Sequence, residues 1–151
     1  VDDITNTFNK KWIYKKFLNE NALFQQNGIC VLVDVIDYNY IQKEYGELLA
    51  NNLLIFATKF IKQKLKDEDF KYEMVRYNDN KFLIFIQNTS EQKKDVVNFI
   101  LNLEQLLSST TLKSNSGLFI KAKYKFNISS YKTNQESKEI FERLLTKQDK
   151  E

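Results

Sequence analysis

The sequence predicts an α/β (α+β) fold, in which a central, mostly antiparallel sheet of about five strands carries helices on both faces. Residues 29–35 form an apolar, β-branched run, which is typical of a strand that is covered on both faces. Two apolar runs flank the polar residues Asn78 and Asp79, which indicates a β-hairpin. Residues 47–65 and 90–107 have apolar side chains at helical spacing. A buried strand, a hairpin and long amphipathic helices together favour this layered arrangement.

The order of the elements follows from periodicity and from residues that begin or end helices. Apolar residues recur at helical spacing between residues 9 and 26, and residues 2–5 can cap the start of that helix. Gly46 separates a short helical turn from a long helix, and Thr89 or Ser90 can cap the helix after the hairpin. The expected elements are, in order, a helix at 9–26, a strand at 29–35, helices at 38–45 and 47–65, hairpin strands at 70–75 and 82–86, a helix at 90–107, a loop at 108–117, a strand at 118–128 and a helix at 135–145.

Length and composition indicate a single domain that spans residues 1–151. The 151 residues are 42% hydrophobic, which is enough to bury a sizeable core, and the length fits one domain better than two. The sequence starts abruptly at Val1 on a helix-start signal. We therefore expect this domain to be a fragment of a longer multidomain protein.

Charge and cysteine usage exclude several classes of protein. The 23 Lys and Arg residues against 20 Asp and Glu residues indicate a mixed surface and not a nucleic-acid-binding patch. Cys30, the only cysteine, lies in an apolar run, which excludes a disulfide framework and indicates a buried thiol in a reducing compartment. No apolar run approaches the roughly 18 residues that a membrane span needs. We expect a cytoplasmic domain, and any membrane anchor of the full-length protein would lie outside this segment.

Four sequence landmarks occur in an order that identifies a family. They are DDIT at residues 2–5 with FNK at 8–10, DVID at 34–37 followed by Ile41 and Tyr45-Gly46, RYNDNKF at 76–82, and FNISSY at 126–131. In this order they resemble the GGDEF domains of bacterial cyclic di-GMP signalling, which are related in fold to the adenylyl cyclase and polymerase palm. The resemblance covers nearly the whole chain. RYNDNKF stands at the place of the family's R-Y-G-G-[DE]-E-F motif.

The resemblance implies a degenerate catalytic centre. Active members join two GTP molecules with Mg²⁺ ions held by carboxylates, at positions that match Asp34 and Asn80, and by a backbone carbonyl that matches Val35. Asn80 lacks the negative charge of a carboxylate, and Lys81 adds a positive charge. We therefore expect Asp34, Asn80 and Lys81 to be vestigial, with weak metal binding at Asp34 and Val35 at most. Asp34 has a second interpretation, as a helix cap, a role that Asp37 also suits.

The nucleotide-binding positions implied by the resemblance are altered as well. Asn78 and Asp79 replace the two hairpin glycines that let the backbone approach phosphate. Gln42 and Asn51 stand where the family reads guanine, and Asn39 stands where it places a phosphate-facing lysine. We expect no cofactor, with Mg²⁺ required only if some activity is retained, and weak GTP binding at most.

Many active family members also carry an R-x-x-D site that binds the product. The matching positions here are Asp69 and Tyr72, so the arginine that would grip cyclic di-GMP is absent. The resemblance therefore implies that this chain has no product-binding site of that kind.

Three functions remain open at this point. The first is a catalytically inactive GGDEF-type regulatory or interaction module in a bacterial signal-transduction protein, with flanking domains or a homodimer partner as its contacts. The second is an active diguanylate cyclase. The third is an RNA-binding sheet domain, because the segment at residues 118–126 interleaves Lys with aromatic residues. An alternating strand with one buried face produces the same pattern, so neither a nucleic acid nor a membrane is the expected partner.

Overall fold

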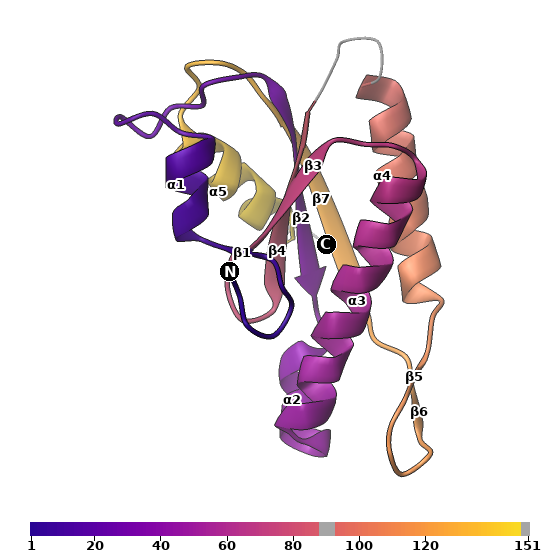
Figure 1. Cartoon of the computed structure of the whole chain (residues 1–151). Coiled ribbons are helices and arrows are strands. Elements are labelled where there is room, and N and C mark those ends of the chain that lie inside the picture. The colour runs from indigo at the N-terminus through magenta and orange to yellow at the C-terminus, as the bar shows by residue number, and fades with distance from the viewer. Residues whose placement is uncertain (88–92, 149–151) are drawn as a thin grey trace.

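A five-stranded sheet forms the centre of the computed structural model, which describes residues 1–87 and 93–148 (Figure 1). In spatial order its strands are β1 (Phe8–Asn9), β3 (Tyr72–Arg76), β4 (Lys81–Gln87), β2 (Gly28–Val35) and β7 (Tyr124–Tyr131). The β1–β3 pair is parallel and the other three pairs are antiparallel. The predicted fold class, a mostly antiparallel sheet with helices, is thereby confirmed.

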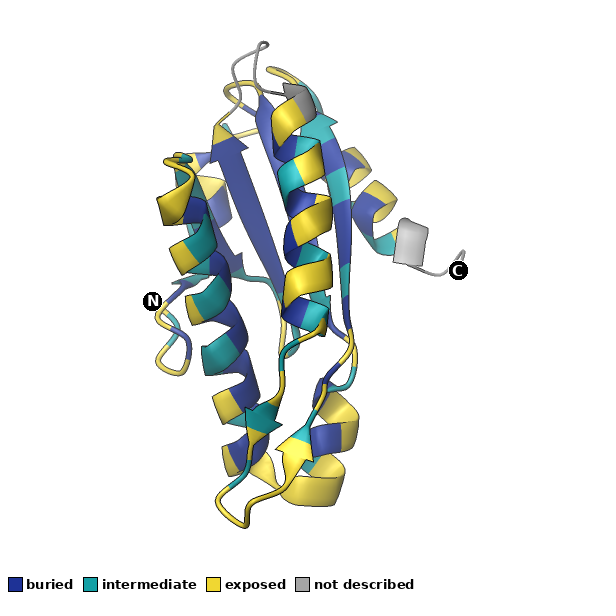
Figure 2. Ribbon diagram, turned by 90° about the vertical axis from the view of Figure 1, so that its right-hand side faces the viewer, coloured by how far each residue is buried: buried dark blue, intermediate teal, exposed yellow. Residues whose placement is uncertain are grey.

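Helices cover both faces of the sheet. On one side lie α3 (Glu47–Asp67) and α4 (Lys93–Ser108), and on the other lie α1 (Lys11–Lys16) and α5 (Ser137–Gln148), while α2 (Tyr38–Tyr45) sits at one end (Figure 1). Alternate residues of β2 enter two different cores. The odd-numbered ones from Ile29 to Val35 belong to the core under α3 and α4, and Cys30 and Leu32 belong to the core under α1 and α5. This two-sided burial explains the apolar sequence of β2. In Figure 2 buried residues gather in the sheet and on the helix sides that face it, and exposed residues lie on the outer sides of the helices.

The β3–β4 hairpin and strand β2 fix the register around the expected site. Asp34 pairs with Lys81 across the β2–β4 ladder, and Gly28 pairs with Gln87 at its other end. The hairpin closes where the backbone N–H groups of Tyr77 and Asn78 both donate to the Lys81 carbonyl. The loop between β3 and β4 therefore lies beside the carboxyl end of β2.

The helix predicted at residues 9–26 is wrong in length. Helix α1 ends at Lys16, and the chain then folds back so that Leu18 and Phe24 form an antiparallel bridge. The Asn19 side-chain oxygen accepts hydrogen bonds from the backbone N–H groups of Asn21 and Leu23, and Ala22 adopts a φ of 61°. This local turn competes with the helix. Nor does a side-chain hydrogen bond cap the start of α1.

The single strand predicted at residues 118–128 is divided in two. Residues Phe119–Ile120 form β6, which pairs with β5 (Leu112–Lys113) in a separate small hairpin, and β7 begins only at Tyr124. Between them, the Lys123 N–H donates to the Asp37 carboxylate at 2.7 Å, and the Lys123 carbonyl accepts from the Ile36 N–H. These contacts bend the chain before it enters the sheet.

The remaining helices agree with the sequence prediction to within a few residues. The predicted cap of α4 at Thr89 or Ser90 lies outside the described residues. Among residues 1–87 and 93–148, no helix combines the length and the apolarity that a membrane crossing requires.

Candidate functional site

The Asn80 carboxamide lies between the two groups that were expected to hold a metal. Its Nδ2 donates to Asp34 Oδ1 at 3.0 Å and to the Val35 carbonyl at 3.2 Å. Both partners are acceptors, which fixes the orientation of the amide with its NH₂ group toward them. The Val35 N–H donates in turn to the Asn80 carbonyl at 2.9 Å. Asp34 and Asn80 thus face each other across neighbouring segments, as the alignment with the family requires.

Lys81 adds a full positive charge to this group. Its ammonium lies 3.8 Å from Asp34 Oδ1, and both side chains are largely shielded from solvent. Burial raises the pKa of the Asp34 carboxyl, and the Lys81 ammonium opposes that shift without cancelling it. The negative charge of the Asp34 carboxylate is therefore balanced by the ammonium of Lys81.

This donor set does not fit a divalent cation. Mg²⁺ prefers an octahedron of oxygen ligands that includes carboxylates, and here Asp34 Oδ1 and the Val35 carbonyl both accept N–H groups of Asn80. The single negative charge of Asp34 is already balanced by Lys81. Within the described residues, no group of three or more His, Cys, Asp or Glu side chains is placed to hold a metal ion.

Four of the expected nucleotide-binding positions lie together. Gln42, Asn51, Asn78 and Asp79 line one cavity of about 420 Å³, which extends from the hairpin loop to α2 and the start of α3. Asn39 is exposed and is not among the residues that line it. The structure therefore brings four of these five residues together, and Asn39 lies apart from them.

The charge of this cavity is unfavourable for a triphosphate. Asp2, Glu47 and Asp79 contribute carboxylates, and Arg76 contributes the one guanidinium in the lining. The Arg76 side chain is already used by the protein, because its Nη2 donates to the Asp79 carbonyl at 2.8 Å and its Nη1 contacts the Asp2 carboxylate. A phosphate would meet more negative than positive charge here.

The contact between Arg76 and Asp2 was not foreseen from the sequence. Arg76 Nη1 lies 3.0 Å from Asp2 Oδ1 and 3.1 Å from Asp2 Oδ2, and the second oxygen also accepts from the Thr5 N–H and hydroxyl. Burial alone would raise the pKa of Asp2, but the Thr5 hydrogen bonds and the Arg76 guanidinium together lower it. Asp2 and Arg76 each lie in one of the four sequence landmarks. Sequence patterns do not predict a contact between residues so far apart along the chain.

The helix-cap interpretation of Asp34 and Asp37 is wrong. The Asp34 carboxylate interacts with Asn80 and Lys81, and Asp37, although it is the N-cap residue of α2, makes no side-chain cap hydrogen bond. Its carboxylate accepts instead from the Lys123 N–H.

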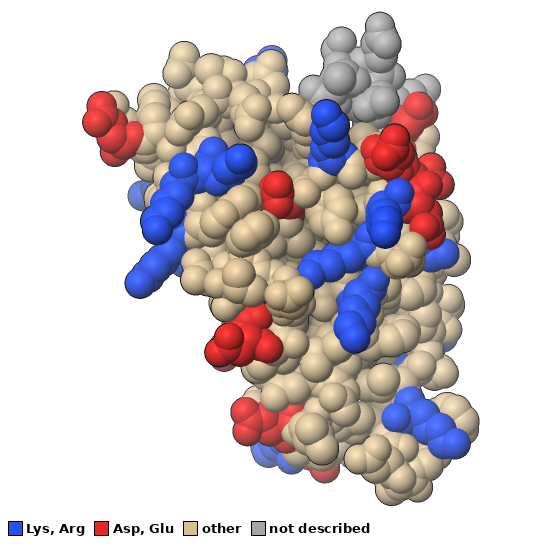
Figure 3. Space-filling view, viewed as in Figure 1, with Lys and Arg blue, Asp and Glu red and all other residues tan. Residues whose placement is uncertain are grey.

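The part of β7 that motivated the RNA-binding hypothesis is covered by helices on both faces. Tyr124 and Phe126 of β7 are buried in the core under α3 and α4, and the buried Asn127 donates to the Leu144 carbonyl of α5. On the face shown in Figure 3, acidic residues lie among the basic ones. The mode of RNA binding that motivated the third hypothesis therefore has no surface on the described residues.

The fold matches solved structures at low sequence identity. The GGDEF domain of DgcB from Caulobacter crescentus, solved with cyclic di-GMP, is 14% identical, with a TM-score of 0.78 over 97% of this chain and 85% of that one. The FimX GGDEF domain from Pseudomonas aeruginosa is 14% identical, with a TM-score of 0.76 over 96% and 88%. Diguanylate cyclase SiaD from Pseudomonas aeruginosa, solved with its activator SiaC, is 12% identical, with a TM-score of 0.79 over 96% of this chain, which spans only 55% of the SiaD chain.

A family model gives the assignment. No curated protein sequence matches the chain. The model of the diguanylate cyclase GGDEF domain, however, matches residues 1–150. The chain therefore belongs to the GGDEF family of diguanylate cyclase domains, the family of cyclic di-GMP signalling.

Proposed function

We propose that this domain is a catalytically inactive GGDEF-type module with a regulatory or interaction role in a bacterial signal-transduction protein. The observation that carries the proposal is the position of Asn80, whose amide N–H groups bind Asp34 and the Val35 carbonyl at 3.0 and 3.2 Å. The two groups that would ligate a metal are thereby satisfied by the protein itself.

The positive charge of Lys81 also disfavours a bound cation. Two unit charges 4 Å apart interact by about 4 kcal/mol at an effective dielectric of 20, and Lys81 lies 3.8 Å from Asp34. A cation that displaced the Asn80 amide would meet a carboxylate that is already paired. It would also gain no carboxylate from Asn80, since a neutral amide oxygen is a weaker ligand for a hard divalent ion.

The phosphate side of the site supports the proposal independently. Catalysis of phosphoryl and nucleotidyl transfer depends on positive groups that stabilise the charge of the transition state. In the cavity next to Asn78 and Asp79, the guanidinium of Arg76 is committed to Asp2 and to the loop backbone. No lysine lines that cavity among the described residues.

The test is an assay for cyclic di-GMP synthesis. The purified domain is incubated with GTP and either Mg²⁺ or Mn²⁺, and the products are separated by chromatography. We expect no cyclic di-GMP above the level of a no-enzyme control. A steady product peak that disappears in Asp34→Ala would refute the proposal and establish an active cyclase.

The interaction role requires a separate measurement. We propose that the contacts of this module are flanking domains of the same protein or a second copy of this chain. Light scattering of the purified domain over a range of concentrations distinguishes the second possibility, because a homodimer would double the molar mass as the concentration rises. A constant monomer mass would exclude a homodimer of the isolated domain at those concentrations.

A further inference from the structure

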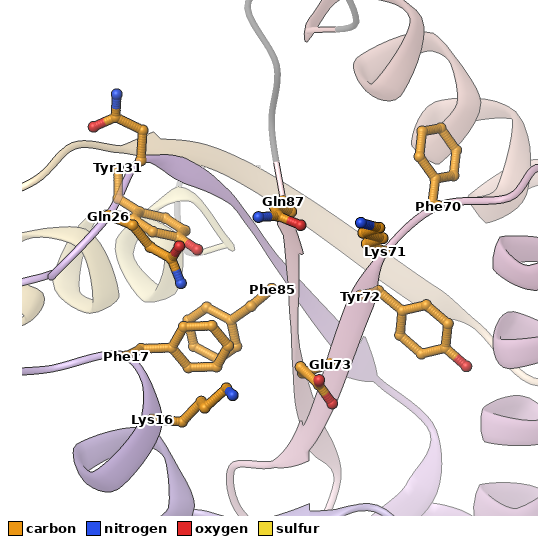
Figure 4. Close-up of a pocket in the computed structure, with 11 residues that line it drawn as sticks. Lys16, Phe17, Gln26, Phe70, Lys71, Tyr72, Glu73, Phe85, Gln87 and Tyr131 are labelled. Carbon is orange, nitrogen blue, oxygen red and sulfur yellow. The ribbon is translucent and has the colours of Figure 1, made fainter.

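A second cavity lies at the end of the sheet away from the hairpin loop. Its volume is about 560 Å³, in the range of small-molecule sites, and it lies between the segment that joins α1 to β2 and the first residues of β3 (Figure 4). Phe17, Phe85 and Tyr131 form its aromatic side. The rings of Phe17 and Phe85 stack with centroids 4.2 Å apart.

The Tyr131 hydroxyl in this cavity has no hydrogen-bond partner among the described residues. Tyr131 is 3% exposed, and no hydrogen bond from its hydroxyl to residues 1–87 or 93–148 is formed. In Figure 4 the hydroxyl points toward the middle of the cavity. Phe24 stacks on the Tyr131 ring at 4.1 Å, which holds the ring in place. A buried hydroxyl without a partner destabilises a protein, so its retention calls for an explanation.

Gly28 allows Tyr131 to take this position. The two residues are cross-strand partners in the β2–β7 ladder, and the tyrosine ring lies directly over the glycine. A Cβ atom on residue 28 would lie 2.3 Å from the Tyr131 hydroxyl and 2.5 Å from Cζ. Only glycine therefore leaves room for the hydroxyl to cross β2 toward the cavity.

The rim of the cavity favours an anion. Lys16 and Lys71 are both exposed, and both line the cavity that Figure 4 shows. Glu73 is the one acidic residue among the described residues that line it. The side-chain amides of Gln26 and Gln87 add neutral hydrogen-bond donors.

We propose that this cavity binds a small organic carboxylate, whose carboxylate group accepts a hydrogen bond from the Tyr131 hydroxyl within reach of Lys16 and Lys71. The apolar body of the ligand rests against Phe17 and Phe85. Burial, with a smaller contribution from Cys30, raises the pKa of Tyr131, so the hydroxyl stays protonated and acts as a donor at neutral pH. The site is separate from the Asp34 and Asn80 group and does not depend on whether the domain is catalytic.

The test titrates the 151-residue chain with phenylacetate and with its neutral analogue phenylacetamide, followed by NMR. For a ligand of this size we expect a dissociation constant on the order of 1 mM for phenylacetate. The side-chain amide signals of Gln26 and Gln87 should shift on saturation. Phenylacetamide should bind at least about tenfold more weakly, because it lacks the charge that the lysines attract.

Two variants separate the hydroxyl from the rest of the cavity. Tyr131→Phe removes only the hydroxyl and should weaken phenylacetate binding about tenfold or more. Without ligand it should raise the Tm by about 2–4 °C, because an unsatisfied buried group is removed. Tyr40→Phe is the control, since Tyr40 is exposed and is not among the residues that line the cavity, and it should change neither quantity.

Several outcomes would overturn the proposal. These are the absence of saturable phenylacetate binding, equal affinity for phenylacetamide, and unchanged affinity in Tyr131→Phe. A Tm of Tyr131→Phe that is equal to or below that of the parent would show that the hydroxyl is already satisfied, which removes the premise. A Lys16→Gln and Lys71→Gln double variant that binds phenylacetate as tightly as the parent would also contradict it.

Discussion

The guanidinium of Arg76 holds the carboxylate of Asp2, at 3.0 and 3.1 Å from its two oxygens, and so ties the N-terminal loop to the β3–β4 hairpin. The pair is largely shielded from solvent, with side chains 13% and 18% exposed. Arg76 also donates to the carbonyls of Asn78 and Asp79, so one side chain fixes both the loop and the hairpin turn. The contact between Asp2 and Arg76 therefore helps to hold the loop that carries Asn78 and Asp79.

Removing the charge of Asp2 should destabilise the domain in a pH-dependent way. The folded-state pKa of Asp2 is lowered, so its contribution to stability is present above the unfolded value near 3.8 and is lost as the pH falls through the folded value. Asp2→Asn should therefore reduce the free energy of unfolding by about 1–2 kcal/mol at pH 7. Urea unfolding at pH 7 and pH 3 measures this difference, which should shrink at pH 3.

The exposed neighbour Asp3 provides the control for that measurement. Asp3→Asn removes the same charge from the same loop without a contact to Arg76, and it should change the stability by less than about 0.5 kcal/mol at either pH. An equal loss in both variants would show that net charge, and not the Arg76 contact, accounts for the effect.

Restoring carboxylates at the hairpin should restore metal binding without restoring catalysis. In Asn80→Glu with Lys81→Glu, the amide no longer occupies the Asp34 carboxylate and the opposing ammonium is gone. Isothermal titration calorimetry should then detect Mg²⁺ binding by the double variant, which Asp34→Ala should abolish, and no such binding by the parent domain. Turnover of GTP should stay absent, because Asn78, Asp79 and Gln42 are unchanged; cyclic di-GMP production by the double variant would contradict this account.

Replacing Gly28 by a larger residue should destabilise the domain while Tyr131 is present. An alanine Cβ would lie 2.3 Å from the tyrosine hydroxyl, and the stacked ring of Phe24 limits how far Tyr131 can move. We expect Gly28→Ala to lower the free energy of unfolding by about 1–3 kcal/mol. In a Tyr131→Val background the same substitution should cost less, and denaturant unfolding of the four proteins gives the coupling energy. Simple additivity would mean that the close contact is relieved elsewhere.

The domain should not bind cyclic di-GMP at Asp69 and Tyr72. Recognition of the product at that place relies on an arginine, and the two arginines of the chain are engaged elsewhere: Arg76 with Asp2, and Arg143 with Glu139 and Ser129. Asp69 lies in a turn with a φ of 59°. Calorimetry with cyclic di-GMP should show no heat of binding, and micromolar binding that Asp69→Ala abolishes would prove the expectation wrong.

Sequence patterns predicted the sheet and its long helices because these are set by burial over many residues. The apolar run before Val35 and the helical spacing after Gly46 each reflect a whole buried face. The first helix was predicted too long because its apolar residues keep a helical spacing beyond Lys16, while a single side chain, Asn19, satisfies the backbone in a different way. The hydrogen bonds of the Asn19 side chain thus end the helix although the apolar residues keep a helical spacing.

The candidate site was predictable in position but not in detail. The landmarks predicted that Asn80 would lie near Asp34, and the hairpin register, which pairs Lys81 with Asp34, places it there. The Asn80 amide donates to both Asp34 and Val35 only in one side-chain rotamer, and the sequence does not predict that rotamer. The Tyr131 hydroxyl was missed for a related reason, because its position depends on Gly28 in a strand distant in sequence.

The shortness of β1 exposes part of the sheet edge to other chains. β1 pairs with β3 only at Val75 and Arg76, and the Lys71 carbonyl faces β4, so by antiparallel alternation the backbone groups of Tyr72 face outward. An open edge of this kind is a template for strand-to-strand aggregation. Lys71 and Glu73 place charges beside it and make the addition of an apolar strand unfavourable.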